Sequence, residues 1–174
     1  MYSLYINNIL VKGNEKLPLE KELNLNVPFT LKSHEALLNI YFTATCIRKY
    51  ATEFLSQFDL TDVQLNLMMM LGHQSPKGGG LTQARLSEMM LVNRANITSL
   101  VDRMEKAGFV TRTTAEGDRR SNIIKLTEKG KNLLEKVEPL YAKEVRNIMS
   151  PLEGAEQQKL MDMLQKVRGN MRQT

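Results

Sequence analysis

The stretch LTQARLSEMMLVNRANITSLVDRMEKAGFVTRTTAEGDRRSNIIKLTEKG, residues 81–130, decides the fold of this chain. Thr82 is placed to cap a helix that runs to about Met90, and Asn93 is placed to cap a second helix that Gly108 ends. The second helix carries an apolar stripe at three- and four-residue spacing, which comprises Ile97, Leu100, Val101 and Met104. Two short helices joined by a tight turn can place the second one in the major groove of DNA.

A short β-hairpin is predicted directly after these helices. Residues 109–114 and 121–126 have strand composition and flank a turn that contains glycine. Apolar and polar residues alternate along the second strand, so one face packs and the other meets solvent. The tip, residues 116–120, reads Glu-Gly-Asp-Arg-Arg and forms a basic finger beside the helices.

The positive charge of the chain is concentrated in the same segment. The whole chain has a net charge of +5, and residues 81–131 hold ten Lys and Arg against six Asp and Glu, a net charge of +4. This distribution is the footprint of a protein that binds a polyanion. A solvated basic face is the alternative that charge alone leaves open.

Composition excludes several other classes. At 174 residues, one domain with helical extensions is expected. No apolar run approaches the roughly 18 residues that span a bilayer. The N-terminus lacks the basic region and cleavage site of an export signal, and the single cysteine, Cys46, fits a reducing cytoplasm.

Catalytic chemistry has no support in the residue pattern. The chain has no Gly-rich phosphate loop and no plausible pair of nucleophile and base. Its two histidines, His34 and His73, stand apart from any cluster of cysteines or acids. We therefore expect no enzyme activity, no cofactor and no metal site.

Helices are predicted on both sides of the central segment. Residues 1–32 form an arm of unknown role, either a strand or a segment that docks on a partner. Ser33 is expected to cap a helix over residues 34–58, and Thr61 with the glutamine three residues later forms a capping box for a helix over 62–71.

The C-terminal third is also predicted to be helical. Thr127 is expected to cap a long helix to about Met149, which Pro139 should kink. The sequence Ser-Pro-Leu-Glu at 150–153 combines an N-cap, proline at the first helical position and glutamate at the third, so a last helix should begin there and reach about Met171.

The expected fold is mainly α, a winged helix-turn-helix with a two-stranded wing. Its DNA-binding domain spans 59–126, and a helical dimerisation region combines 33–58 with 127–174. The apolar faces of the flanking helices are too extensive for the small central core to cover. We therefore expect a homodimer.

The wing residues are similar to those of a known family. Asp118-Arg119-Arg120-Ser121, followed by Leu126-Thr127-Glu128-Lys129-Gly130, resembles the wing signature of MarR-type transcription regulators. Residues 81–87 and 99–110 look like the two helices of that family's helix-turn-helix. The resemblance is strong over about 60–135, topological for the flanking helices and absent over 1–32. It implies a two-fold symmetric dimer that binds a short pseudo-palindrome, often with repression relieved by a small molecule or an oxidant.

The residue pattern and the resemblance together indicate candidate DNA contacts. The exposed start of the second helix can reach base edges through Arg94, Asn96, Thr98 and Ser99. The helix before it opens with Thr82 and Gln83, where backbone amides favour phosphate. The full set of candidates is Thr82, Gln83, Asn93, Arg94, Asn96, Thr98, Ser99, Arg103, Arg112, Arg119 and Arg120.

Individual roles are expected in the wing. Arg112, on its first strand, is a phosphate candidate. The resemblance implies that Arg120 enters the minor groove, where A·T tracts concentrate negative potential. Asp118 would repel phosphates, so we expect it to pair with a nearby arginine and support the wing. Arg119 can equally be a solvated turn residue.

Two features bear on regulation. The resemblance implies a redox switch at Cys46, because peroxide-sensing members of the family carry a reactive cysteine near tyrosines on the first helix, and Cys46 lies near Tyr41 and Tyr50. An inert buried cysteine is the commoner case. Methionines at 68–70 and 89–90 can line a ligand pocket or simply fill the core. We expect a DNA-binding repressor released by a small effector, such as a phenolic or other aromatic acid. The alternative is a constitutive regulator or one controlled through Cys46.

Overall fold

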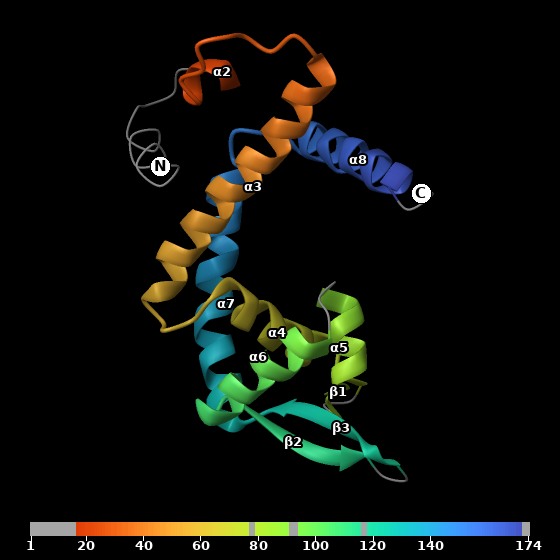
Figure 1. Ribbon diagram of the computed structural model, residues 1–174. Helices are drawn as coiled ribbons and strands as arrows, with labels where there is room; N and C mark the ends of the chain where they lie inside the picture. Colours follow the sequence, from red (N-terminus) through yellow and green to blue (C-terminus); the bar gives the residue numbers. More distant parts are fainter. Residues whose placement is uncertain (1–16, 77–78, 91–93, 116–117, 172–174) are drawn as a thin grey trace. The chain divides into compact units, whose positions relative to one another are not determined.

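A computed structural model describes residues 17–76, 79–90, 94–115 and 118–171 (Figure 1). The chain divides into two compact units, one ending at Gln64 and the other beginning at Leu65. The described part is mainly helical with one small antiparallel sheet, as the sequence predicts.

The first unit consists of α2 (Leu19–Glu22), α3 (Lys32–Ser56) and the start of α4 (Asp62–His73). Its buried residues are Leu19, Ala51, Leu55 and Leu60. The predicted cap Ser33 is wrong, because Leu31 is the N-cap and supplies no side-chain hydrogen bond. The first turn is instead stabilised by an acid at the positive end of the helix, since Glu35 lies there and pairs with Lys32 at 2.7 Å.

The predicted capping box of α4 is confirmed. Gln64 N donates to Thr61 Oγ1 at 3.3 Å, and Thr61 N donates to Gln64 Oε1 at 2.9 Å. The helix runs two residues beyond the predicted end and includes Gly72, whose Cβ position would lie 2.8 Å from Leu134 Cδ2. Glycine at 72 therefore lets α4 approach α7 closely.

The second unit contains the helix-turn-helix pair, α5 (Gln83–Met90) and α6 (Arg94–Lys106), followed by the hairpin of β2 (Val110–Ala115) and β3 (Asp118–Leu126). This hairpin projects beyond the helices of its unit at the bottom of Figure 1. Residue 110 pairs with 126 and residue 114 with 122, before the register shifts near the tip.

One short strand was not predicted. β1 (Leu81–Thr82) pairs antiparallel with β3, which gives the sheet order β1-β3-β2. Gly80 makes this pairing accessible, because its φ is +87° and an added Cβ would overlap with the carbonyl oxygen of Ile124.

The helices α7 (Glu128–Met149) and α8 (Gly154–Met171) complete the chain, and α7 continues through Pro139. The predicted start of α8 at residues 150–153 is wrong. Ser150 is the C-cap of α7, and its hydroxyl donates to Asn147 O at 2.9 Å. The amide of Glu153 is satisfied by Glu156 Oε2 at 2.9 Å, so α8 begins after the predicted signal.

The core of the second unit lies where α4, α5, α6, the sheet and α7 meet. The apolar stripe predicted for α6 is fully or almost fully buried. It lies with Leu65, Leu67, Met68, Leu71, Leu81, Leu86, Val110, Ile124, Leu134 and Val137 among the buried residues of this unit. The core therefore holds α6 by one face and leaves its other face outward.

Candidate nucleic-acid interface

Helix α5 begins with the cap that the sequence predicts. Arg85 N donates to Thr82 Oγ1 at 3.1 Å, so the Thr82 side chain satisfies an amide at the start of the helix. Gln83 is the first residue of α5 and is half-buried. The side chain of Arg85 pairs with Glu88 along the helix at 3.1 Å.

Helix α6 presents a row of polar side chains opposite its buried stripe. Asn96, Thr98, Ser99 and Arg103 are all exposed. Arg94 is the first residue of the helix, but its side chain lies outside the described part, and Asn93 lies outside it altogether. Three of the four residues predicted to read base edges are thus exposed on the side of α6 away from its buried stripe.

Of the wing tip, residues 116–117 lie outside the described part of the chain, and residues 118–120 are described by their backbone alone. Asp118, Arg119 and Arg120 begin β3, and their side chains lie outside the described part of the chain. The minor-groove role of Arg120 and the supporting role of Asp118 therefore stay predictions.

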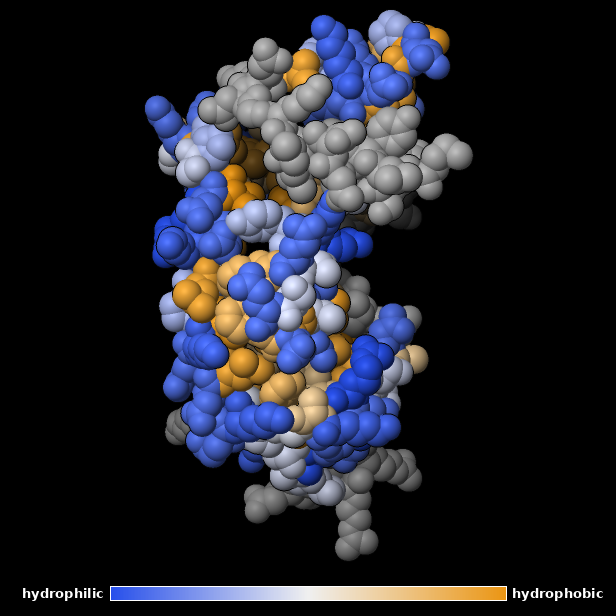
Figure 2. Space-filling model, turned by 90° about the vertical axis from the view of Figure 1, so that its left-hand side faces the viewer, coloured by the Kyte–Doolittle hydropathy of each residue, from blue (hydrophilic) through white to orange (hydrophobic). Residues whose placement is uncertain are grey.

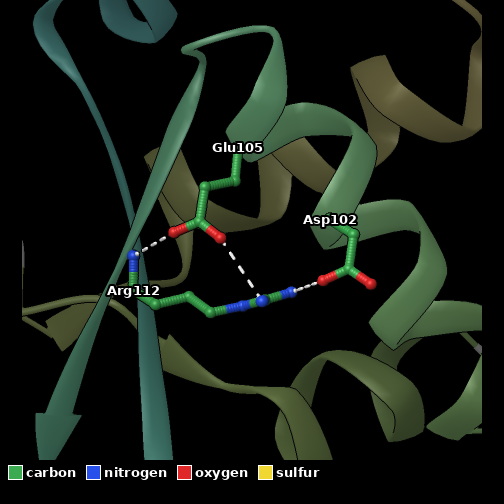
Figure 3. A network of polar contacts seen from close by, with 3 residues as sticks. All are labelled: Asp102, Glu105 and Arg112. Carbon is green, nitrogen blue, oxygen red and sulfur yellow. Dashed lines mark hydrogen bonds and ion pairs between the residues drawn. The ribbon is translucent and has the colours of Figure 1, made fainter.

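Arg112 has partners that the sequence did not predict. Its Nη2 donates to Asp102 Oδ1, and its Nη1 lies 3.3 Å from Glu105 Oε2 (Figure 3). Its backbone N–H donates to Glu105 Oε1 at 3.2 Å. The guanidinium of Arg112, on β2, is therefore directed at two carboxylates of α6. We call these three residues, Asp102, Glu105 and Arg112, the α6–β2 network.

The strand register explains this direction. Arg112 lies opposite Ile124, and Val110 lies opposite Leu126. Residues that face each other across antiparallel strands share one side of the sheet, and both Val110 and Ile124 are buried. Arg112 is thus on the packed side of the wing. The alternation Val110-x-Arg112 and the spacing Asp102-x-x-Glu105 are the sequence signals that could have revealed the network.

The C-terminus of α6 is tied to the N-terminus of α7. Gly108 has φ +76° and ends the helix as predicted. Thr127 Oγ1 donates to Gly108 O at 2.7 Å and accepts from Gly130 N at 3.0 Å, so one hydroxyl joins the two helix ends. Lys129 Nζ donates to Ala107 O at 2.7 Å and lies 4.9 Å from the centre of the Phe109 ring.

Cys46 is half-buried in α3. Burial raises the pKa of its thiol, the carboxylate of Glu22 raises it further, and Lys49 acts in the opposite sense. A raised pKa leaves less thiolate at neutral pH, which disfavours reaction with oxidants.

Apolar side chains reach the surface on the helices outside the helix-turn-helix (Figure 2). On α3 the most exposed is Tyr41, at 62%, and Met171 of α8 is 64% exposed. Others are Leu37, Ile40, Ile47, Tyr50, Leu140, Val145, Met161, Met163 and Val167. α8 has no buried residue at all.

The described residues offer neither a metal-binding cluster nor a helix suited to cross a membrane. No group of three or more His, Cys, Asp or Glu is arranged to hold a metal ion there. None of the described helices combines the length and the apolar character that a membrane crossing requires.

Part of the chain is similar in sequence to a family of known proteins. Residues 58–121 match the family model described as the MarR family. The chain is 33% identical over 87 residues to the HTH-type transcriptional regulator PecS of Dickeya dadantii, covering 50% of this chain and 52% of that protein. It is 36% identical over 77 residues to the uncharacterized HTH-type transcriptional regulator YfiV of Bacillus subtilis, covering 44% and 46% respectively. The chain thus spans about half the length of the curated relatives it matches.

Solved structures share the fold over most of the chain. AbsC, a MarR family transcriptional regulator from Streptomyces coelicolor, aligns with a TM-score of 0.74 at 20% identity, covering 85% of this chain and 100% of that one. A mutant MarR from E. coli complexed with operator DNA aligns with a TM-score of 0.69 at 21% identity, covering 80% and 99%. At these identities the likeness shows the fold.

Proposed function

We propose that this chain is a regulator of the MarR type, because residues 58–121 match that family's model, and that it binds DNA and represses from a pseudo-palindromic operator. The observation that carries the proposal is the face of α6, where Asn96, Thr98, Ser99 and Arg103 are exposed opposite a buried stripe. The net charge of +4 over 81–131 supports the same conclusion. The named relatives are transcription regulators, not enzymes.

The proposed contacts divide into reading and positioning. Arg94, Asn96, Thr98 and Ser99 read base edges in the major groove, where Arg suits guanine and Asn suits adenine. The start of α5 and the flanks of α6 contact phosphates through Thr82, Gln83, Asn93 and Arg103. The wing reaches the minor groove through Arg119 and Arg120, supported by Asp118.

The proposed regulator acts as a homodimer. Exposed apolar side chains on α3 in the first unit, and on α7 and α8 in the second unit, are those that we propose a second copy would cover. A dimer with two-fold symmetry presents two copies of α6 to two half-sites, which matches a pseudo-palindrome.

The proposed effector is a small aromatic or phenolic acid that releases the protein from DNA. The redox alternative through Cys46 is less well supported, because the thiol pKa is raised by burial. The two are separated by measuring DNA binding with and without peroxide, in wild type and in Cys46→Ser. Peroxide sensitivity that disappears in the variant would favour the redox alternative.

The deciding experiment is fluorescence anisotropy of the full chain on duplex from its own upstream region, titrated with salt and against scrambled competitor. We expect tight, sequence-selective binding with two chains per site. Asn96→Ala should relax specificity within the half-site, and Arg120→Ala should reduce the preference for A·T flanks. If neither the upstream duplex nor a selection from random duplexes yields selective binding, the proposed function is overturned.

A further inference from the structure

We infer that Arg112 is a positioning residue for DNA binding, an inference that rests on the proposed function. Its guanidinium holds the wing strand β2 against α6 and offsets the charge of two carboxylates there. In this role Arg112 acts through α6 and the wing and makes no phosphate contact of its own.

The geometry of the α6–β2 network supports this role. Both terminal nitrogens of the guanidinium are engaged, one by Asp102 and one by Glu105 (Figure 3). The remaining Nε is buried and has no hydrogen-bond partner among the described residues. Only 26% of the Arg112 side chain is exposed. A planar guanidinium can bridge two carboxylates in this way, whereas a lysine ammonium is a single point charge.

Glu105 adds a second connection between the same elements. One of its oxygens accepts the backbone N–H of Arg112 at 3.2 Å, and the other lies 3.3 Å from Nη1. Glu105 thus contacts both the backbone and the side chain of Arg112 on β2. The orientation of β2 relative to α6 is therefore coupled to this one pair of residues.

The inference can be tested by whether neutralising the two acids of the network tightens or weakens DNA binding. Asp102 and Glu105 lie on the helix that presents the reading residues, and Asp102 is next to the exposed Arg103. Neutralising both acids makes the protein more positive by two charges, which by simple electrostatics tightens DNA binding. It also frees Arg112 for phosphate. If the network positions the wing, the same change weakens specific binding.

The experiment compares Asp102→Asn/Glu105→Gln with wild type in the full chain, by anisotropy on the selected duplex. We expect the double variant to bind about tenfold more weakly, within the range of coupling between contacting residues. Tighter binding with a steeper salt dependence would overturn the inference and favour a phosphate contact by Arg112. Arg112→Lys should also bind more weakly than wild type, although it keeps the charge.

Salt dependence provides the matched control. Arg103→Met removes an exposed arginine of the same helix, and we expect it to lower the steepness of log K against log salt by about 0.9. Arg112→Met should weaken specific binding with little change in that slope. A slope reduction equal to that of Arg103→Met would also overturn the inference.

A second measurement requires no DNA. Thermal unfolding of Arg112→Met, Asp102→Asn/Glu105→Gln and the triple variant forms a double-mutant cycle for the network. We expect the losses to be smaller in combination than their sum, and additive losses would contradict the coupling. If the cycle shows coupling but wild type binds no duplex selectively, the proposed function fails and the network stands as a structural link alone.

Discussion

At position 130 the backbone of the neighbouring segment leaves no room for a side chain. The carbonyl oxygen of Phe109 occupies the place of a Cβ, and Leu126 Cδ2 lies 3.2 Å from it. Gly130 is buried in the first turn of α7, where Thr127 also bonds its amide. The glycine of the wing signature is therefore required by the close approach of two chain segments.

Gly130→Ala should destabilise the protein by about 3 kcal/mol, since backbone must move to accept the methyl group. The loss is measured by chemical denaturation of the full chain. The matched control is Gly169→Ala in α8, where an added Cβ meets nothing within 4 Å. There the gain in helix propensity should stabilise by roughly 0.5–1 kcal/mol. Equal effects at both positions would contradict the steric argument.

Cys46 yields a prediction on pH dependence. Burial raises the pKa of its thiol, so the reactive thiolate forms only at higher pH than in an unstructured peptide. Alkylation by iodoacetamide should therefore be slow at neutral pH and should reach half its limiting rate above the pH found for a cysteine in a short peptide. Alkylation faster than in that peptide at neutral pH would contradict the prediction.

The residue-level contacts of the site were only partly predictable. The polar face of α6 follows from helical periodicity, because the buried stripe determines which positions are outward. The sequence predicts Arg112, on the first wing strand, as a phosphate contact, and it does not predict its partners on α6. Those partners depend on the register between β2 and β3, which places Arg112 opposite Ile124, and the sequence of one strand does not determine that register.

At the scale of elements, a single threonine joins three segments. Thr127 caps α7, donates to Gly108 O at the end of α6, and its backbone N–H donates to Phe109 O at 3.0 Å. The wing leaves α6 at Gly108 and returns at Thr127, so this junction closes the base of the hairpin.

Thr127→Val keeps the shape of the side chain but removes the hydroxyl. We expect a loss of about 1–2 kcal/mol from the cap and the second hydrogen bond. The control is Thr52→Val in α3, whose hydroxyl only bonds back to Arg48 O on an exposed helix face. The control should change the free energy of unfolding by less than about 0.5 kcal/mol. Denaturant titration of both variants decides the matter.

Helix ends were predicted well where a side chain supplies the cap, as at Thr61, Thr82 and Thr127. They were wrong at Ser33 and Ser150, where a residue of capping type is present but its hydroxyl does not cap the following helix. β1 was missed because two residues are too short for a periodic pattern, and its pairing depends on Gly80 and a distant strand.

At the scale of the whole molecule, the two units differ in how they bury apolar residues. The second unit has a continuous core around α6, whereas the described α3 buries only Ala51 and Leu55. In the proposed dimer, the exposed apolar side chains of this helix of 25 residues would be covered by the second copy. Periodicity predicts those apolar positions, but a single sequence does not state which surface covers them.

We therefore expect Ile40→Glu/Tyr41→Glu to shift the protein from the proposed dimer to a monomer. Both residues are exposed in the single chain, so the change should leave the folded chain intact while placing charges in the proposed interface. Sedimentation velocity should show the change in mass, and circular dichroism should be unchanged. Asn66→Glu, at an exposed polar position of α4, is the control and should remain dimeric.

The same pair of variants connects assembly to DNA binding. When two linked copies of α6 bind two half-sites, the second binding event is intramolecular. Such linkage can raise affinity by roughly 10²–10⁴-fold. Ile40→Glu/Tyr41→Glu should therefore lose at least about a hundredfold in affinity for a two-half-site duplex. Its affinity for a single half-site should equal that of Asn66→Glu. Undiminished affinity of the monomeric variant for the full site would mean that one chain suffices for recognition, and the dimer would have no part in reading the operator.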